Sequence, residues 1–447
     1  MKHRLFGLVC LGWLSFIPSK AETPAVIAIR NARIVTVSGP VIAKGTVVVR
    51  NGLIEAVGEN ATPPADAWII DGEGFTVYPG LIDAMNTLGL ADAGPMAGAG
   101  GGGRRGGGPP TGQPSAPAGP PARGPEDRPL NTSYLLAADQ LAPNDRRIEA
   151  ARNAGFTSAV TFPNRNIFSG QGAVINLAGE RAGNMVVQSP AGMLLTMRSA
   201  GFGSGYPGSL LGVIAYIRQI YLDAAQYKTA KELYAAHPSG NRRPDYDKHL
   251  EGVLAAPRIL LPAGNAKEIE RMLRFGQELQ QETILYGLQE GYRTAGLLKR
   301  YNGKALVNLN WPEKSRDADP EQVESLRVLE VRDKAASTPA ELKKAGIPFA
   351  FYAGALSQPS DVGRAVKKAI DAGLTPADAV RALTLSAAEL FGVADRIGSI
   401  EKGKIANLVV TNGDLFQDRT RIKYVLVDGV KYEPAAEQPA PPSEATR

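Results

Sequence analysis

Few side chains in this sequence could bind a metal ion or serve as a covalent nucleophile. The 447 residues include three histidines and one cysteine. Imidazole and thiolate groups are the side chains that most often hold zinc, and a catalytic cysteine acts as its thiolate. His3 and Cys10 lie close to the N-terminus, so only His237 and His249 remain for the main body of the chain. No G-x-S-x-G motif, the mark of a serine nucleophile on a strand-to-helix turn, is present.

Two groups of carboxylates are the remaining candidates for chemistry. Asp83 lies in the stretch VYPGLIDAMNTLGL, which covers residues 77–90 and ends a predicted strand. It is either a catalytic group or a structural residue that fixes the strand end, and we favour the structural interpretation. The run from Asp245 to His249 alternates acidic and other residues, but it follows a polar NRRP segment. We interpret it as a solvated loop.

The first 21 residues have the pattern of a secretion signal. Lys2, His3 and Arg4 precede an apolar run from Leu5 to Ile17, and small residues follow at a potential cleavage site. The run is too short to span a bilayer, and no later segment approaches the roughly 20 apolar residues that a membrane helix needs. We therefore expect a periplasmic or secreted protein with a signal peptide at 1–21. The processed chain would contain no cysteine, which excludes disulfides, thiolate metal sites and a cysteine nucleophile.

The formal charge of +6 falls to +3 without the signal segment, an excess too small and too scattered to indicate nucleic-acid binding. The two ends of the processed chain look like short strands joined by tight turns. Asn51-Gly52 and Asp428-Gly429 are typical of two-residue hairpin turns. Neither end alone forms a sheet large enough to bury a core. We therefore predict one small composite β-sandwich domain from residues 22–80 and 399–433.

Between these ends, apolar runs of strand length alternate with segments of helical periodicity. The strand candidates are GLIDAM, TSAVTF, AVINLA, MLLTM, RILLPA, TILYG, ALVNL and PFAFYA. Alternation of this kind favours parallel βα units, and roughly eight strands suggest a closed barrel. The predicted fold is α/β, with a TIM-like (β/α)8 barrel over residues 81–398.

Two low-complexity segments interrupt or follow the predicted domains. Residues 91–129 are rich in Gly and Pro, and 434–447 are rich in Pro, Ala and Glu. Such compositions bury too little apolar surface to fold, so we expect both segments to be disordered. The first would emerge at the C-terminal face of the barrel, where barrel active sites lie.

Four stretches of the sequence resemble the amidohydrolase superfamily, most closely its imidazolonepropionase-like branch. They are the N-terminal strands ending in YPGLID, then GFTSAVTFPNRNIFSGQGAVINLAG, then TPADAVRALTLSAAELFGVADRIGSIEKGKIANLVV, and the closing VLVDGV. The resemblance covers about residues 24–433. It implies a barrel enzyme in which histidines and an aspartate at the strand ends hold one or two divalent ions such as zinc. The metal activates water for hydrolysis of non-peptide C–N bonds.

The positions that carry metal ligands in the family hold other residues here. The first-strand frame Pro79–Asp83 is intact, but its two histidine positions hold Met85 and Thr87. The fifth-strand histidine corresponds to about Pro262, and the sixth-strand one falls within 286–289, which read Tyr-Gly-Leu-Gln. The last-strand aspartate corresponds to Gly354 or its neighbour Ala353. Two histidines cannot supply four imidazole ligands in any alignment, so we expect no metal cofactor.

These observations lead to the hypothesis of an exported amidohydrolase-like pseudoenzyme that binds a ligand or a protein partner. Its barrel mouth would be lined by Met85, Thr87, Pro262 and Gly354, an apolar set suited to a small apolar or aromatic molecule. The possible protein partners are a second copy of the chain or an intact amidohydrolase homologue. The alternative is an active hydrolase with unorthodox chemistry, either a metal-free acid–base pair of carboxylates or a metal held by oxygens alone.

Overall fold

The computed structural model describes residues 24–90, 125–199, 205–314, 319, 321 and 323–434. The predicted signal peptide, most of the Gly/Pro-rich insertion and the tail after Pro434 lie outside these residues. The last five residues of the predicted insertion are described. Among them Arg128 is mostly buried and pairs with Asp223 at 3.2 Å and with Asp247 at 2.9 Å. Arg128 thus has specific partners, and the expected disorder of the insertion stays a prediction.

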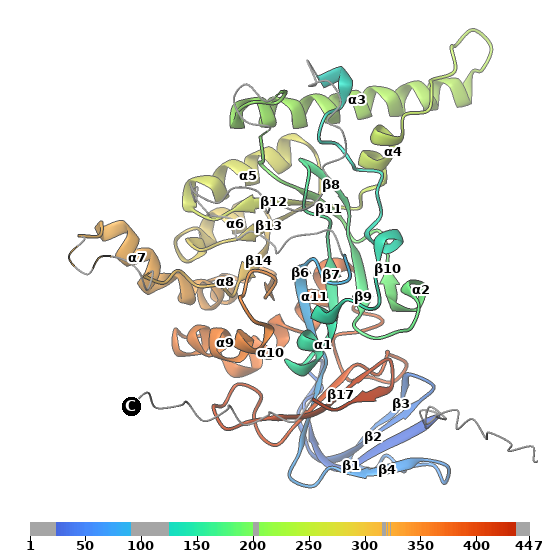
Figure 1. Cartoon of the computed structure of the whole chain (residues 1–447), viewed down its shortest axis with the longest axis vertical. Helices are drawn as coiled ribbons and strands as arrows, with labels where there is room; N and C mark the ends of the chain where they lie inside the picture. The colour runs from blue at the N-terminus through green and yellow to red at the C-terminus, as the bar shows by residue number, and fades with distance from the viewer. Residues whose placement is uncertain are drawn as a thin grey trace, which may run out of the picture.

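Both ends of the chain contribute strands to one domain, at the bottom of Figure 1. Its eight strands form a single hydrogen-bonded sheet, in the order β18-β17-β16-β5-β1-β2-β3 with β4 beside β1. The strands are β1 (Val26–Ile34), β2 (Ile42–Arg50), β3 (Leu53–Gly58), β4 (Trp68–Asp71), β5 (Thr76–Pro79), β16 (Leu408–Thr411), β17 (Ile422–Val427) and β18 (Val430–Tyr432). The composite sheet domain predicted from the sequence is confirmed, but its strands belong to one sheet rather than to two separate ones.

The two predicted hairpin turns have the required backbone. Asn51 and Gly52 have φ angles of 49° and 80°, and Asp428 and Gly429 have 52° and 75°. Positive φ at both central residues defines the turn whose twist matches paired strands. The turns also meet each other, since a Cβ on Gly429 would lie 2.8 Å from the Gly52 Cα. This contact brings the N-terminal and C-terminal parts of the sheet domain together.

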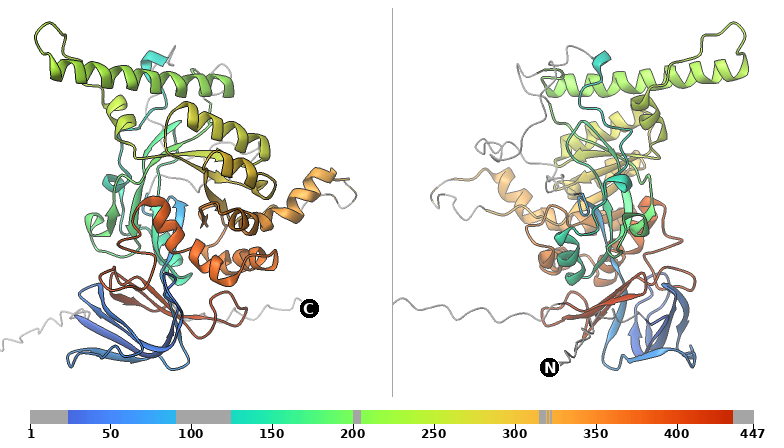
Figure 2. Two further views of the ribbon diagram at one scale, coloured as in Figure 1. Left: turned by 180° about the vertical axis from the view of Figure 1, so that it is seen from behind. Right: turned by 45° about the vertical axis from the view of Figure 1, so that its right-hand side comes forward.

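Above the sheet domain (Figures 1 and 2) the strands of the central region form two hydrogen-bonded sheets, in the orders β10-β9-β7-β6 and β15-β14-β13-β12-β11-β8. The two sheets adjoin where β6 contacts β15, and together they are called the ring here. Its strands are β6 (Leu81–Asn86), β7 (Phe156–Thr161), β8 (Phe168–Gln171), β9 (Ala173–Asn176), β10 (Val186–Gln188), β11 (Met193–Leu195), β12 (Ile259–Ala263), β13 (Thr283–Gly287), β14 (Lys304–Asn308) and β15 (Phe349–Tyr352). Strands β11 to β15 pair in parallel, and so do β6 and β7. The predicted α/β fold is confirmed in this arrangement.

The ring departs from an all-parallel barrel at one place. β8 and β9 are separated only by Gly172. β9 pairs antiparallel with β7 and β10, and β8 pairs antiparallel with β11. No long helix lies between β7 and β11, so the regular strand–helix alternation expected from the sequence is wrong for this part. Gly172 is required at the bend, because a Cβ there would lie 2.3 Å from the Phe162 ring.

Helices cover the outside of the ring. They are α1 (Arg146–Asn153), α2 (Ala182–Met185), α3 (Leu210–Ala236), α4 (Lys248–Ala255), α5 (Ala266–Glu278), α6 (Ala295–Arg300), α7 (Leu326–Lys334), α8 (Thr338–Ala345), α9 (Val362–Asp371), α10 (Pro376–Ala382) and α11 (Leu385–Phe391). Only Leu383 and Thr384 separate α10 from α11. Among the described residues, no helix is long and apolar enough to cross a membrane.

Two apolar clusters follow from this arrangement. One lies between the ring and most of its helices, and the other lies on the inner face of the strands and also takes in Ala387, Ala388, Leu390 and Phe391 of α11. The interior cluster includes Met85, Leu260, Tyr286, Leu306 and Tyr352. Because successive side chains of a strand point to opposite faces, this set identifies which strand positions face inward.

Candidate functional site at the ends of the ring strands

Asp83 joins the first and last strands of the ring. Its side chain is 4% exposed and accepts hydrogen bonds from the Ala353 backbone N–H at 2.8 Å and from the Asn86 Nδ2 at 2.9 Å. Burial raises the pKa of this carboxyl to about 6, although the hydrogen bonds oppose the shift. The carboxylate therefore connects β6 to the end of β15, two strands that are not paired by regular backbone hydrogen bonds.

Met85 and Thr87 point in different directions. Met85 is completely buried within the interior cluster of the ring. Thr87 is also buried, but its hydroxyl accepts a hydrogen bond from the Arg147 Nη1 of α1 at 3.0 Å. The two residues at the first-strand ligand positions therefore do not face a common space.

A cavity of about 300 Å³ lies beside Thr87, between β6, β15 and α1. Asp83, Thr87, Arg147 and Gly354 are among its lining residues, whereas Met85 and Pro262 are not. The four residues expected to line one apolar mouth are thus divided between this cavity and the ring interior. Sequence spacing alone could not reveal the division, because β6 has an irregular register between Asp83 and Asn86.

Gly354, which with Ala353 is one of the two positions expected to correspond to the family's last-strand aspartate, has no room for a side chain. A Cβ added to it would lie 2.5 Å from the Met85 carbonyl oxygen and 2.8 Å from the Asn86 Cβ. Real Cβ atoms do not approach a backbone oxygen this closely. Any side chain at position 354 would therefore require the neighbouring backbone to shift.

Pro262, Tyr286, Asn308 and Tyr352 occupy the ends of β12 to β15 on the inner face. Pro262 pairs with Tyr286 across β12 and β13, and Asn308 pairs with Tyr352 across β14 and β15. Tyr286 and Tyr352 belong to the interior cluster, so their cross-strand partners lie on the same face. Tyr286 falls within the range expected for the sixth-strand ligand, whereas no local pattern in the sequence marks Asn308 or Tyr352.

Polar atoms of this group are buried without a partner. Tyr352 is fully buried and Asn308 is 1% exposed. Neither the Tyr352 hydroxyl nor the Asn308 Nδ2 has a hydrogen-bond partner in the described part of the chain. The Tyr286 hydroxyl makes only a long contact, 3.5 Å, to the Leu195 carbonyl oxygen. Burial raises the pKa of Tyr352 well above its ordinary value, and Tyr286 and Asp83 nearby act in the same direction.

Metal ions of the family type do not fit these residues. Among the described residues, no three His, Cys, Asp or Glu side chains come together as a potential metal site. His237 caps the C-terminal end of α3, as the sequence suggests. His249 belongs to α4, whose N-cap is Asp247, and its Nδ1 lies 3.0 Å from the Asn131 carbonyl oxygen. The interpretation of 245–249 as one solvated loop was therefore wrong for its last residues.

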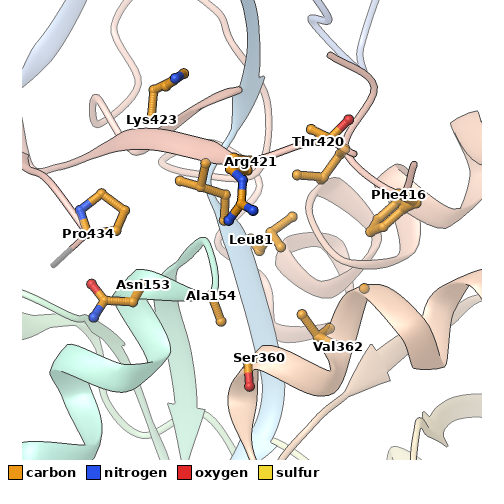
Figure 3. A pocket seen from close by; sticks show the side chains of 13 residues that line it. Leu81, Asn153, Ala154, Ser360, Val362, Phe416, Thr420, Arg421, Lys423 and Pro434 are labelled. Carbon is orange, nitrogen blue, oxygen red and sulfur yellow. The ribbon is translucent and has the colours of Figure 1, made fainter. Parts of the chain in front are cut away.

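A larger cleft lies away from the strand ends, between the ring and the sheet domain. It has a volume of about 540 Å³ (Figure 3). Figure 3 shows the Arg421 guanidinium group directed into it, toward Leu81, with Phe416 and Val362 on the other walls. Nothing in the sequence marked these residues, because they come from β6, α9 and the loop before β17 and meet only in the folded chain.

Comparisons with known proteins agree with this architecture. A model of the amidohydrolase family matches residues 331–431. A crystal structure of an amidohydrolase from Thermotoga maritima MSB8 is 25% identical, with a TM-score of 0.69, over 91% of this chain and 100% of that one. A prolidase complexed with N-methylphosphonate-L-proline shares the fold, with a TM-score of 0.52 and 16% identity over 92% of this chain and 100% of that one.

A shorter match involves an adenine deaminase from Moorella thermoacetica. It is 42% identical over 64 residues, which amount to 14% of this chain and 10% of that protein. The match therefore spans only about a tenth of this curated relative. It adds a local sequence similarity to the similarity in fold.

Proposed function

We propose that the chain, which is similar to the amidohydrolases in its fold and in a family match over residues 331–431, is an exported, non-catalytic member of that group. It binds a small, uncharged ligand at the ends of β12 to β15. The observation that carries the proposal is the pair of buried, unpartnered polar atoms on Asn308 and Tyr352. A buried polar group without a hydrogen bond costs roughly 1–3 kcal/mol, so a ligand that pairs with both would recover this free energy.

The chemistry of the group defines the ligand. The Asn308 Nδ2 donates a hydrogen bond, and the phenol groups of Tyr286 and Tyr352 can donate or accept. None of the three carries a charge at neutral pH, and the interior cluster around them is apolar. A carbonyl oxygen on an apolar or aromatic body matches this environment, because its oxygen accepts while its body displaces water.

A second candidate, an active hydrolase without the usual metal, has one observation in its favour. Asp83 lines the 300 Å³ cavity, and burial raises its pKa to about 6, which is a suitable range for a general acid or base. Against it, the carboxylate accepts hydrogen bonds from two strands and holds the ring together. No second carboxylate lines this cavity, so the pair of carboxylates that this metal-free alternative needs is incomplete.

The test combines metal analysis with a binding assay on purified protein. Protein grown with added zinc, manganese and iron is expected to contain far less than one equivalent of any metal. Benzamide, which offers a carbonyl oxygen on an aromatic ring, is expected to raise the thermal midpoint, and toluene to raise it less. Stoichiometric metal that supports hydrolysis, and that is lost when Tyr286 is replaced, would overturn the proposal.

A further inference from the structure

Among the described helices α3 is the longest, and the described chain leaves most of its outer face exposed. Its inner face packs on the body of the protein through Val213, Ile217, Ile220 and Ala224. Three leucines lie on the opposite side: Leu211 is 77% exposed, Leu222 61% and Leu233 52%. Figure 2 shows that the second half of the helix extends beyond the ring and its other helices. Leucines aligned along one face of a helix can all pack against the same partner helix, because that helix runs alongside the whole face.

The leucines are spaced symmetrically. Leu211 and Leu233 each lie 11 residues from Leu222 in the sequence. Eleven residues make about three helical turns and a distance of about 16 Å, with a rotation of only about 20°. Leu211, Leu222 and Leu233 therefore form a nearly straight stripe along the helix. The two outer leucines lie at equal distances on either side of Leu222.

We propose that this stripe is the contact surface between two copies of the chain. In an antiparallel pair with a two-fold axis at Leu222, that residue meets its own copy. Leu211 then meets Leu233 of the second copy at both ends of the contact. A two-fold interface requires the same patch on both partners, and a stripe symmetric about its centre meets this requirement. The proposal does not depend on the proposed function, since α3 lies on the outside of the ring.

The charges along the stripe suit a second copy. The residues between the leucines on this face are small or uncharged: Ala215, Gln226 and Thr229. The one cation on the face, Arg218, is already paired with Glu278 of α5. In the antiparallel arrangement Glu232 approaches the first turn of the other copy's α3, and a carboxylate is favourable at a helix N-terminus. The pairing therefore places no like charges opposite each other.

The size of the contact sets its strength. A helix of 27 residues is about 40 Å long, and with a face about 10 Å wide it buries roughly 400 Å² on each partner. The total, near 800 Å², is below the 1,200–2,000 Å² of stable complexes. The dimer is accordingly weak and depends on protein concentration.

Sedimentation velocity over a concentration series up to about 0.5 mM tests the proposal. We expect a reversible monomer–dimer equilibrium. Leu222→Glu, which puts two carboxylates face to face at the axis, should lower the association constant at least tenfold. The matched control is Leu326→Glu on α7, where the leucine is 81% exposed and lies off the stripe. This control should leave the constant unchanged within a factor of two.

Cysteine crosslinking tests the orientation. In a chain whose only native cysteine is replaced by Cys10→Ser, Leu222→Cys should form a disulfide-linked dimer under mild oxidation. Leu211→Cys alone should not, because the two copies of residue 211 lie about 33 Å apart. A mixture of Leu211→Cys and Leu233→Cys chains should crosslink again. A chain that stays monomeric at the highest concentration, a dimer lost in Leu326→Glu but retained in Leu222→Glu, or self-crosslinking of Leu211→Cys would each refute the proposal.

Discussion

The carboxylate of Asp83 accepts a hydrogen bond from the backbone N–H of Ala353 at 2.8 Å, and this bond links the first and last strands of the ring. The position of Asp83 in the Pro79–Asp83 frame suggests a strand-end role from sequence, but its partner is 270 residues away. Beside this contact, a Cβ on Gly354 would lie 2.5 Å from the Met85 carbonyl oxygen. The hydrogen bond thus ties β6 to the end of β15 next to a position that has no room for a side chain.

Replacement of Asp83 with Asn should remove a pH dependence of stability. Because its pKa is raised from 3.8 to about 6, the folded protein binds more protons than the unfolded chain between about pH 4 and pH 6. The free energy of unfolding therefore falls as pH rises through this range, by at most about 3 kcal/mol. Urea unfolding at several pH values measures the slope. The exposed control Asp245→Asn should keep it, and an unchanged slope in Asp83→Asn would contradict the assignment.

Substitution of Gly354 by Ala should destabilise the protein by roughly 3 kcal/mol or more, because the new Cβ meets the Met85 carbonyl oxygen at 2.5 Å. Gly363→Ala in α9 is the control, since no atom lies within 4 Å of its Cβ. Its stability should rise by no more than about 1 kcal/mol. Gly354→Asp should also fail to create metal binding. Chemical denaturation and elemental analysis check these outcomes, and a well-folded, metal-binding Gly354→Asp protein would show that the backbone has room after all.

Removal of the Tyr352 hydroxyl should raise the stability of the free protein but weaken its binding of the ligand. Tyr352→Phe is expected to raise the free energy of unfolding of the ligand-free protein by about 1 kcal/mol, because it deletes an unpaired buried hydroxyl. The same change should weaken the thermal stabilisation by benzamide. Tyr424→Phe, which deletes another unpartnered buried hydroxyl in the sheet domain, should affect stability alone. Equal benzamide responses in the two variants would argue against a ligand at Tyr352.

Loss of the Arg147 side chain should loosen the segment after β6. Its guanidinium donates to the Thr87 hydroxyl, to the Thr87 carbonyl oxygen at 2.8 Å and to the Leu90 carbonyl oxygen at 3.0 Å. Arg147→Ala should therefore lower the free energy of unfolding by about 1–2 kcal/mol and speed amide exchange near Leu88. The neighbouring exposed Arg146, changed to Ala, should shift stability by less than about 0.5 kcal/mol. Equal effects of both substitutions would remove the anchoring role from Arg147.

Much of the architecture follows from the sequence because it depends on local patterns. The apolar runs at β6, β12 and β13 and the turns at Asn51-Gly52 and Asp428-Gly429 have periodicities or φ requirements that neighbouring residues reveal. The scarcity of imidazole groups is a property of composition, so the expectation of missing metal ligands needed no coordinates. The antiparallel course of β8–β9 was not predictable in this way, since an apolar run has the same appearance in either direction.

The sequence by itself determined the residue types at the positions expected to hold metal ligands, and it carries the resemblance to the amidohydrolases. Only the tertiary structure decided where those residues point: Met85 into the ring, Thr87 toward Arg147, and Gly354 against a backbone oxygen. It also brought Asn308 beside Tyr352, from strands 41 residues apart or more along the chain. The physical reason is that side-chain direction and burial depend on strand register and closure of the ring, which are set by contacts between distant segments and leave no local pattern.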